Sequence, residues 1–437
     1  MTIPSRPLVR SIVTAMWLMN AAACAKHDIR LTSVPPTPAT PPATREVVLV
    51  GNNWDGTVTA FSPKPPYEVL GTFGVVPDKA FLDDETDRSL TRSLDMSLIR
   101  GLAGEGHDQL VDDIFSSSDG RYLFASRPSY RDVVAIDLTD PGNPQPHWRT
   151  RVKGTRADHA AISRDGQTLL VSASTARRVH VIDTATGKIE TSFASGDEPH
   201  ESNYTHDGKT IFHASIGRVF LPTTSTLADP LKGNRWFEIV DAETFKVRER
   251  YDMRERTKAF GQEWKDAAVR PMAISSDDQK VYFQMSFLHG YYVFDVGKKQ
   301  VVDMKKLPGF EEVERLRPSE FQLNSADHGI TISGDDKKLC VAGTITGMAY
   351  IVDIDPFRVT TIDLHDPQHP EIPPKPYWST TSADGKDCYI SISGLNQVVV
   401  IPFADAAIRG VVRVGFHPQR VRNGHILTAA LASRAQP

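Results

Sequence analysis

Side chains suited to acid–base chemistry or metal binding recur at one spacing along this chain. Each stands seven residues before an aspartate of a predicted tight turn. The six positions found in this way are Asp112, Asp158, His200, Arg270, His328 and Tyr377. The next residues along, and the C-terminal segment, add Asp113, His159, Glu201, Trp378, Gln419 and Arg420. If the repeats surround an axis, these side chains are expected to meet at one mouth of a central channel.

These residue types suit three kinds of chemistry. Imidazole and carboxylate ligands bind Zn, Fe, Mn or Cu, so His159, His200 and His328 are candidate ligands of a divalent metal. Such a metal polarises a carbonyl or activates water. Without a metal, the same histidines are candidate general bases. The residues predicted to contact a bound ligand are Asp112, Asp113, Asp158, Glu201, Arg270, Tyr377, Trp378 and Arg420.

The aspartates that set this spacing belong to a repeat. An apolar strand leads to an Asp-Gly pair or a variant of it, and a second apolar strand follows. Successive turns are 46, 42, 70, 58 and 49 residues apart, which is typical of four-stranded propeller blades that carry insertions. Asp-Gly supplies the positive φ angles of a tight hairpin. No helix of useful length is predicted to interrupt the strands, which disfavours an α/β fold.

Six turns indicate six complete blades, and the two ends of the chain supply a seventh. Its strands are predicted at residues 417–422, 46–51, 57–61 and 67–73. Pairing the two ends in one sheet closes the ring and removes exposed sheet edges. The predicted fold class is all-β: a seven-bladed β-propeller over residues 45–427, in which one C-terminal strand pairs with three N-terminal strands.

The repeat resembles the YVTN type of seven-bladed propeller, to which the exported YncE-like bacterial proteins belong. The shared signature is the Asp-Gly turn followed by a strand that ends like Val181-Ile182-Asp183. The resemblance covers residues 46–424 and implies the fold more strongly than the function. It also implies that a histidine at the position of His200 commonly packs between blades, so a structural role stays open. Insertions near residues 76–108 and 219–234 depart from the family pattern and are expected to carry functions particular to this chain.

The first 24 residues are predicted to be a secretory signal peptide. Arg6 and Arg10 precede a short apolar core, and small residues follow at positions 21–23. Cys24 resembles the lipidated cysteine of a bacterial lipoprotein, and plain cleavage nearby is the alternative. We therefore expect an exported protein, either periplasmic or tethered to the membrane by an N-terminal lipid.

Two further segments flank the predicted propeller, and two cysteines lie inside it. Residues 25–44 are predicted to be a Pro-rich linker, and residues 428–437 a tail. Cys340 and Cys388 lie within apolar, strand-like runs. Two cysteines do not form a disulfide framework, so we expect buried free thiols rather than a bridge or a metal pair.

Composition limits the classes of function. The 437 residues include 50 Lys and Arg against 54 Asp and Glu, and 40% are hydrophobic. These values are ordinary for a soluble globular chain and give no electrostatic basis for nucleic-acid binding. The leading hypothesis is an exported, monomeric propeller that binds a small molecule, a metal or a protein partner at the channel mouth. The alternatives are a metal- or histidine-dependent lyase, lactonase or hydrolase, and non-covalent handling of haem or quinone in a periplasmic redox pathway.

Overall fold

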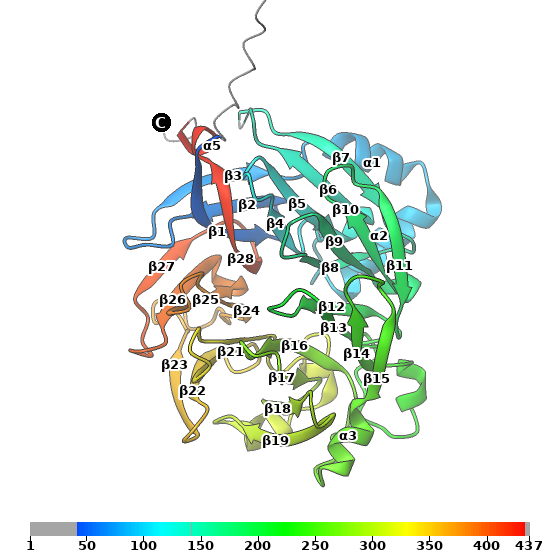
Figure 1. Ribbon diagram of the computed structural model, residues 1–437, viewed down its shortest axis with the longest axis vertical. Coiled ribbons are helices and arrows are strands. Elements are labelled where there is room, and N and C mark those ends of the chain that lie inside the picture. The colour runs from blue at the N-terminus through cyan, green and yellow to red at the C-terminus, as the bar shows by residue number, and fades with distance from the viewer. Residues whose placement is uncertain (1–41, 141, 433–437) are drawn as a thin grey trace, which may run out of the picture. The chain divides into compact units, whose positions relative to one another are not determined.

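The computed structural model describes residues 42–140 and 142–432. Over these residues, seven four-stranded antiparallel sheets are arranged around a central axis (Figure 1). The predicted seven-bladed β-propeller is therefore confirmed. The predicted signal peptide, the lipidation of Cys24 and most of the predicted linker lie outside the described residues.

Six blades are formed by four consecutive strands each, and the seventh joins both ends of the chain in the order β28-β1-β2-β3. The strands of the seventh blade are β28 (Pro418–Leu427), β1 (Thr44–Asn52), β2 (Thr57–Phe61) and β3 (Val69–Gly74). Those of the next three blades are β4 (Ile114–Ser116), β5 (Tyr122–Arg127), β6 (Asp132–Asp137), β7 (Gln145–Arg151), β8 (Ala157–Ile162), β9 (Thr168–Ala173), β10 (Arg178–Asp183), β11 (Ile189–Ala194), β12 (Pro199–Tyr204), β13 (Thr210–Ser215), β14 (Trp236–Asp241) and β15 (Val247–Asp252). Those of the last three are β16 (Val269–Ile274), β17 (Lys280–Met285), β18 (Gly290–Asp295), β19 (Gln300–Lys306), β20 (Gly329–Ile332), β21 (Lys338–Gly343), β22 (Met348–Asp353), β23 (Arg358–Asp363), β24 (Pro376–Thr381), β25 (Asp387–Ile392), β26 (Gln397–Pro402) and β27 (Gly410–Arg413).

The ring closes where β28 pairs with β1. The antiparallel register runs from Leu427 opposite Thr44 to Pro418 opposite Asn52. The C-terminal strand is thus the innermost strand of its blade, as the sequence predicted. Because β1 is paired on both sides, the two ends of the chain leave no open edge between the first and last blades.

A repeated contact between a hydroxyl and an aspartate builds the turn of each inner hairpin. Between β8 and β9, Ser163 Oγ donates to Asp165 Oδ1 at 2.5 Å, and the following Gly166 has φ = 72°. Glycine adopts this left-handed conformation without strain. The same contact recurs in the pairs Ser117–Asp119, Thr205–Asp207, Ser275–Asp277, Ser333–Asp335 and Ser382–Asp384. The aspartates that mark the repeat in the sequence therefore stabilise the hairpin turns.

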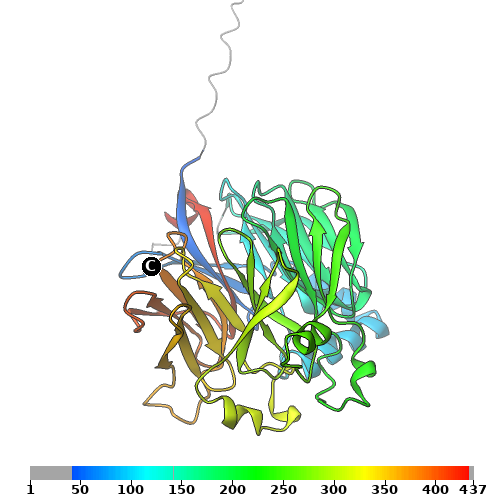
Figure 2. The same ribbon diagram turned by 60° about the horizontal axis from the view of Figure 1, so that its bottom comes forward.

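The first long insertion contains helices that the sequence analysis did not predict. It forms α1 (Lys79–Asp87) and α2 (Leu90–Leu102), whose buried Leu82 and Met96 pack against Tyr130. Shorter helices occur elsewhere: α3 (Met253–Ala259), α4 (Phe310–Glu314) and α5 (Thr428–Ala432). Figure 2 shows α1 to α4 on the same side of the ring. The expectation that no helix of useful length interrupts the strands was wrong, because α2 alone has 13 residues. Helices α1 to α4 lie in connections between strands, so the blades themselves stay all-β.

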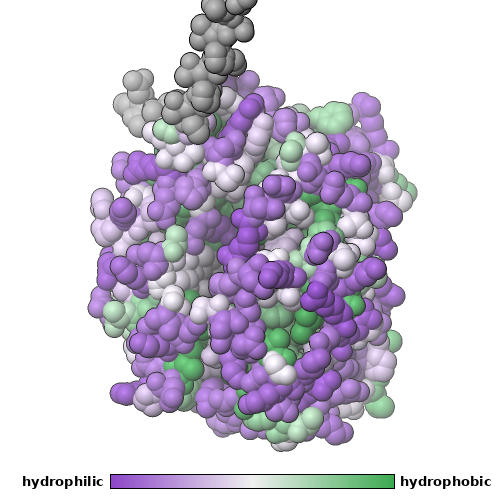
Figure 3. Space-filling model, viewed as in Figure 1, coloured by the Kyte–Doolittle hydropathy of each residue, from purple (hydrophilic) through white to green (hydrophobic). Residues whose placement is uncertain are grey.

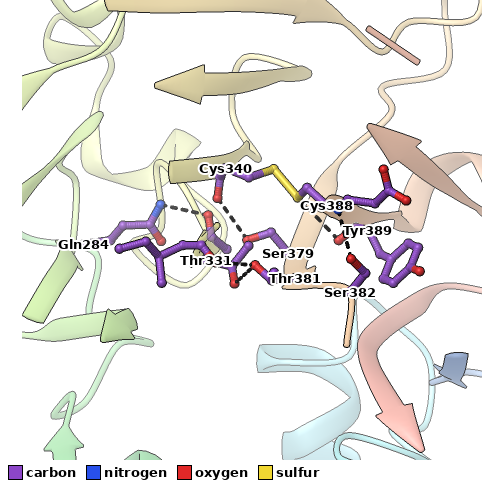
Figure 4. Close-up of a disulfide and its surroundings, with 11 residues drawn as sticks. Gln284, Thr331, Cys340, Ser379, Thr381, Ser382, Cys388 and Tyr389 are labelled. Carbon is purple, nitrogen blue, oxygen red and sulfur yellow. Dashed lines mark hydrogen bonds between the residues drawn. A yellow bond between two sulfur atoms is a disulfide. The ribbon is translucent and has the colours of Figure 1, made fainter. Parts of the chain in front are cut away.

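Cys340 of β21 and Cys388 of β25 form a disulfide between adjacent blades, with their Cα atoms 6.4 Å apart (Figure 4). The prediction of free thiols was wrong. The two residues are 48 positions apart, close to one blade period, so the fold brings them face to face. Their apolar context reflects burial of the bridge rather than of two separate thiols.

The face of the molecule shown in Figure 3 is mainly polar. Hydrophilic side chains dominate this face, and hydrophobic ones occur in small, scattered groups (Figure 3). Within residues 42–140 and 142–432, none of the helices is both long enough and apolar enough to cross a bilayer.

Candidate functional site

Each innermost strand, or the loop that leads into it, brings polar or aromatic side chains toward the axis. The predicted residues are all buried, with at most 9% of their surface exposed. They come from every blade: Asp112 and Asp113 before β4, Asp158 and His159 in β8, His200 and Glu201 in β12, Arg270 in β16, His328 before β20, Tyr377 and Trp378 in β24, and Arg420 in β28. The rule of seven residues before the turn therefore identifies equivalent positions in space.

Recurring β-bulges explain how the inner strands present these side chains. In β8 the pairing with β9 slips between Ala157 and Ala160, which brackets Asp158 and His159. Equivalent slips in β12, β16 and β24 bracket the predicted site residues of those strands. A bulge inserts an extra residue and redirects side chains, and bulges are frequent beside functional sites. In these four strands the predicted positions are thus bulge positions.

The three predicted histidines gather in one cluster. The ring centroid of His159 lies 3.7 Å from that of His200 and 6.4 Å from that of His328. Tyr377 stacks on His328 at 4.2 Å, and Trp378 lies 6.1 Å from His159. Residues from four blades therefore share one buried space.

Two carboxylates lie near His159: Asp112 comes from the neighbouring blade, and Asp158 precedes His159 in β8. His159 Nε2 lies 3.9 Å from Asp112 Oδ2 and 3.8 Å from Asp158 Oδ1. Ligand atoms of these three residues lie within 4.8 Å of one another. Asp112 Oδ2 and Asp158 Oδ1 are buried and have no hydrogen-bond partner in the described part of the chain. Of the three histidines predicted to bind metal, only His159 belongs to this group. Asp112 and Asp158 take the place of His200 and His328.

Arginines surround this group and balance its charge. Arg420 is fully buried, contacts the imidazole of His159 and lies 3.6 Å from Asp112 Oδ1. Arg156 Nη2 lies 3.2 Å from Asp158 Oδ1. Nε and Nη1 of Arg420 are buried without a hydrogen-bond partner among the residues described, and Nε lies 4.0 Å from Asp113 Oδ2. The cluster therefore holds unpaired donors as well as unpaired acceptors, an arrangement that a bound polar ligand would satisfy.

The protonation states of the cluster follow from its burial. Burial raises the pKa of Asp112 to about 7; the charge of Asp158 adds to this rise and Arg420 opposes it. Burial lowers the pKa of His159, His200 and His328 well below the usual value, and nearby arginines lower it further. At neutral pH the histidines are therefore uncharged, which is the form that binds metals.

Other predicted ligand residues are partly engaged by the protein. Asp113 forms a two-armed ion pair with Arg422, at 2.9 Å for the shorter contact. Arg270 donates to Ser286 Oγ at 3.2 Å and to the carbonyl of Leu323. These contacts fix both side chains at the edge of the cluster.

The sequence analysis missed Arg156, Glu198 and Arg422. Arg156 stands two residues before Asp158, and Arg422 stands two residues after Arg420. Positions two apart lie on the same face of a strand, so this alternation was the signal that could have found them. All three lie outside the position seven residues before a turn and the position that follows it.

Comparison with known proteins supports the propeller fold but does not assign the chain to a family. No family model matches the chain, and its sequence matches no curated protein. Among solved structures, it is similar to hydrazine synthase of Kuenenia stuttgartiensis, with a TM-score of 0.51 and 16% identity over 70% of this chain and 86% of that one. This likeness shows the fold alone. The resemblance to the YVTN family is therefore confirmed only at the level of the propeller.

We expect Glu201→Gln to stabilise the protein much more at pH 8 than at pH 5. Burial raises the pKa of Glu201 from its usual 4.5 to about 7, so folding favours the protonated form. The stability contributed by this group is present below pH 4.5 and is lost as the pH rises through 7. Glutamine resembles the protonated form, so the expected gain at pH 8 is roughly 2 kcal/mol. Urea unfolding at both pH values measures it, and a gain independent of pH would contradict the explanation.

Proposed function

We propose that this protein is an exported β-propeller that binds a divalent metal ion close to its axis. One observation supports the proposal above all: Asp112, Asp158 and His159 place ligand atoms within 4.8 Å of one another. Asp112 Oδ2 is a buried carboxylate oxygen without a hydrogen-bond partner in the described residues, and Asp158 Oδ1 is buried with an ion-pair contact to Arg156 Nη2 at 3.2 Å. Carboxylate and imidazole ligands together suit Mn²⁺, Fe²⁺ or Zn²⁺.

Protons compete with the metal ion for this site. Metal ligands must be deprotonated, and the pKa of Asp112 is raised to about 7. We therefore expect the affinity for metal to rise as the pH increases from 5 to 7 and to level off above that range. His159 contributes little to this dependence, because its pKa lies well below the usual value.

Metal analysis of the purified protein tests the proposal. Bound metal is first removed from the protein with a chelator. The protein is then reloaded with Mn²⁺ or Zn²⁺ at pH 7.5 and desalted, and its metal content is measured by inductively coupled plasma mass spectrometry. We expect about one ion per chain, since the three residues form one site. A protein that retains no stoichiometric divalent ion would overturn the proposal.

We expect Arg420→Gln to tighten metal binding. The Arg420 guanidinium contacts His159 and lies 3.6 Å from Asp112, so its charge opposes a cation and its position blocks a ligand nitrogen. Removing a positive charge at this distance should raise the affinity for Mn²⁺ about tenfold. Calorimetric titration measures the change, with the exposed Arg409→Gln as the control. If the natural ligand of the cluster were an anion, Arg420→Gln would weaken its binding and would not tighten that of Mn²⁺.

Export belongs to the same proposal. Disulfides such as that between Cys340 and Cys388 persist mainly in oxidising compartments outside the cytoplasm. The predicted signal peptide and the resemblance to exported propellers of the YVTN type agree with this location. Lipidation of Cys24 and a monomeric state stay predictions.

Acid–base catalysis is a second candidate, and Asp112 favours it. A carboxyl with a pKa of about 7 beside an uncharged imidazole is matched to proton transfer at neutral pH. Such a pair suits the predicted lyase, lactonase or hydrolase chemistry. Turnover of lactones or activated esters that disappears in Asp112→Asn would support it. The haem or quinone alternative stays a prediction.

A further inference from the structure

A cavity of about 350 Å³ lies where the two long insertions meet the mouth of the propeller. Helix α2 and the second insertion supply apolar side chains, and the loops that lead into β8 and β12 supply polar ones. The residues on which the argument rests are Leu98, Leu102, Phe220, Leu323, Arg156 and Glu198. None of these residues is a ligand of the proposed metal site, although Arg156 contacts the proposed ligand Asp158. The cavity therefore adjoins the metal site and has a lining of its own.

The apolar side chains of this cavity are unusually exposed. Leu98 is 57% exposed, Leu102 50% and Phe220 42%. Hydrophobic side chains that line a concave surface and remain open to water mark binding sites, because a ligand buries them. The volume lies at the lower end of the range of small-molecule pockets. A compact ligand with an apolar body fits it.

Arg156 gives the cavity a polar end. Its side chain is only 17% exposed, and Nη2 lies 3.2 Å from Asp158 Oδ1 and 3.3 Å from Gln109 Oε1. Its buried Nε has no acceptor within the described residues. Glu198 also lines the cavity, and burial raises its pKa, which reduces its repulsion of a second carboxylate. The unpaired guanidinium donor calls for an acceptor on the ligand.

We propose that this cavity binds a small amphipathic carboxylic acid, with its apolar body against Leu98 and Phe220 and its carboxylate at Arg156. Guanidinium groups prefer planar carboxylates, and hydrogen bonds between charged partners are the strongest available here. The two insertions thus supply apolar side chains of the site, and the loop before β8 supplies its polar end.

Octanoate serves as the probe, titrated by calorimetry in the presence of a chelator so that the result does not depend on metal. Leu98→Asp is expected to weaken binding at least about tenfold, because it places a charge against the apolar body. Leu90→Asp is the matched control, since Leu90 lies on the same helix, is 76% exposed and lies outside the cavity. It should change the affinity less than about twofold. An equal loss in both variants, or no binding of octanoate at millimolar concentration, would overturn the proposal.

A second comparison tests the carboxylate. Arg156→Gln is expected to weaken octanoate about tenfold while changing the affinity for 1-octanol less than twofold, because only the acid carries a charge for the guanidinium. Equal losses for both probes, or no loss for either, would show that Arg156 does not hold the carboxylate. Metal content, measured in parallel, separates a failure of this proposal from a failure of the metal site.

Discussion

Asp158→Asn is expected to lower the affinity for Mn²⁺ or Zn²⁺ at least about 100-fold, because it removes one of three ligands and one of the two negative charges that attract the ion. Asp158 Oδ1 lies 3.8 Å from His159 Nε2 and 3.2 Å from Arg156 Nη2, so the variant removes charge from the centre of the group and leaves the volume of the side chain nearly unchanged. Folding should be maintained, since asparagine has the same shape. Calorimetric titration of chelator-stripped protein measures the loss.

Asp132→Asn is the control for this variant. Asp132 is equally buried, at 1% exposure, and pairs with Arg127 away from the cluster. Its replacement changes a buried carboxylate but should leave the affinity for metal unaltered. If both variants bind the ion like the unaltered protein, or lose affinity equally, Asp158 is not a ligand.

Replacing Cys340 and Cys388 together by alanine is expected to lower the free energy of unfolding by about 4 kcal/mol. The disulfide closes a loop of 48 residues and links β21 to β25 of two adjacent blades. It therefore lowers the conformational entropy of the unfolded chain. Removing the disulfide raises mainly the conformational entropy of the unfolded state, which lowers the stability of the folded protein. Unfolding in guanidinium chloride measures the loss.

The same experiment has an internal control. A reducing agent should destabilise the unaltered protein by a similar amount and should leave the double variant unchanged. The content of metal should stay at one ion per chain in both, since neither cysteine belongs to the proposed site. Unaltered protein that is insensitive to reduction, or a loss below about 1 kcal/mol, would contradict the stabilising role of the disulfide.

Much of the propeller could be predicted from the sequence because its repeat is a local signal. The aspartates from Asp119 to Asp384 hold their turns through short-range hydrogen bonds, so residue type and spacing reveal each hairpin. Closure by β28 was predictable for a different reason. An incomplete first blade leaves an unpaired edge on β1, and the matching strand lies at the other end of the chain.

The candidate site was predictable in position but not in pairing. Counting back from each turn found Asp112 and Asp158, with His159 as the next residue, because rotational symmetry turns equal spacing into spatial proximity. Which side chains then approach one another depends on bulges and rotamers that spacing does not encode. The disulfide between Cys340 and Cys388 was missed for the same reason, since it depends on how adjacent blades face each other.

Crystals of the protein soaked with Mn²⁺ at pH 8 and measured at the manganese absorption edge test metal binding most directly. We expect one anomalous peak about 2.0–2.3 Å from a carboxylate oxygen of Asp112, a carboxylate oxygen of Asp158 and Nε2 of His159. The Arg420 guanidinium should have moved away from the imidazole. A map without a peak among these three residues, at an ion concentration that saturates the protein in solution, would contradict the proposed metal site.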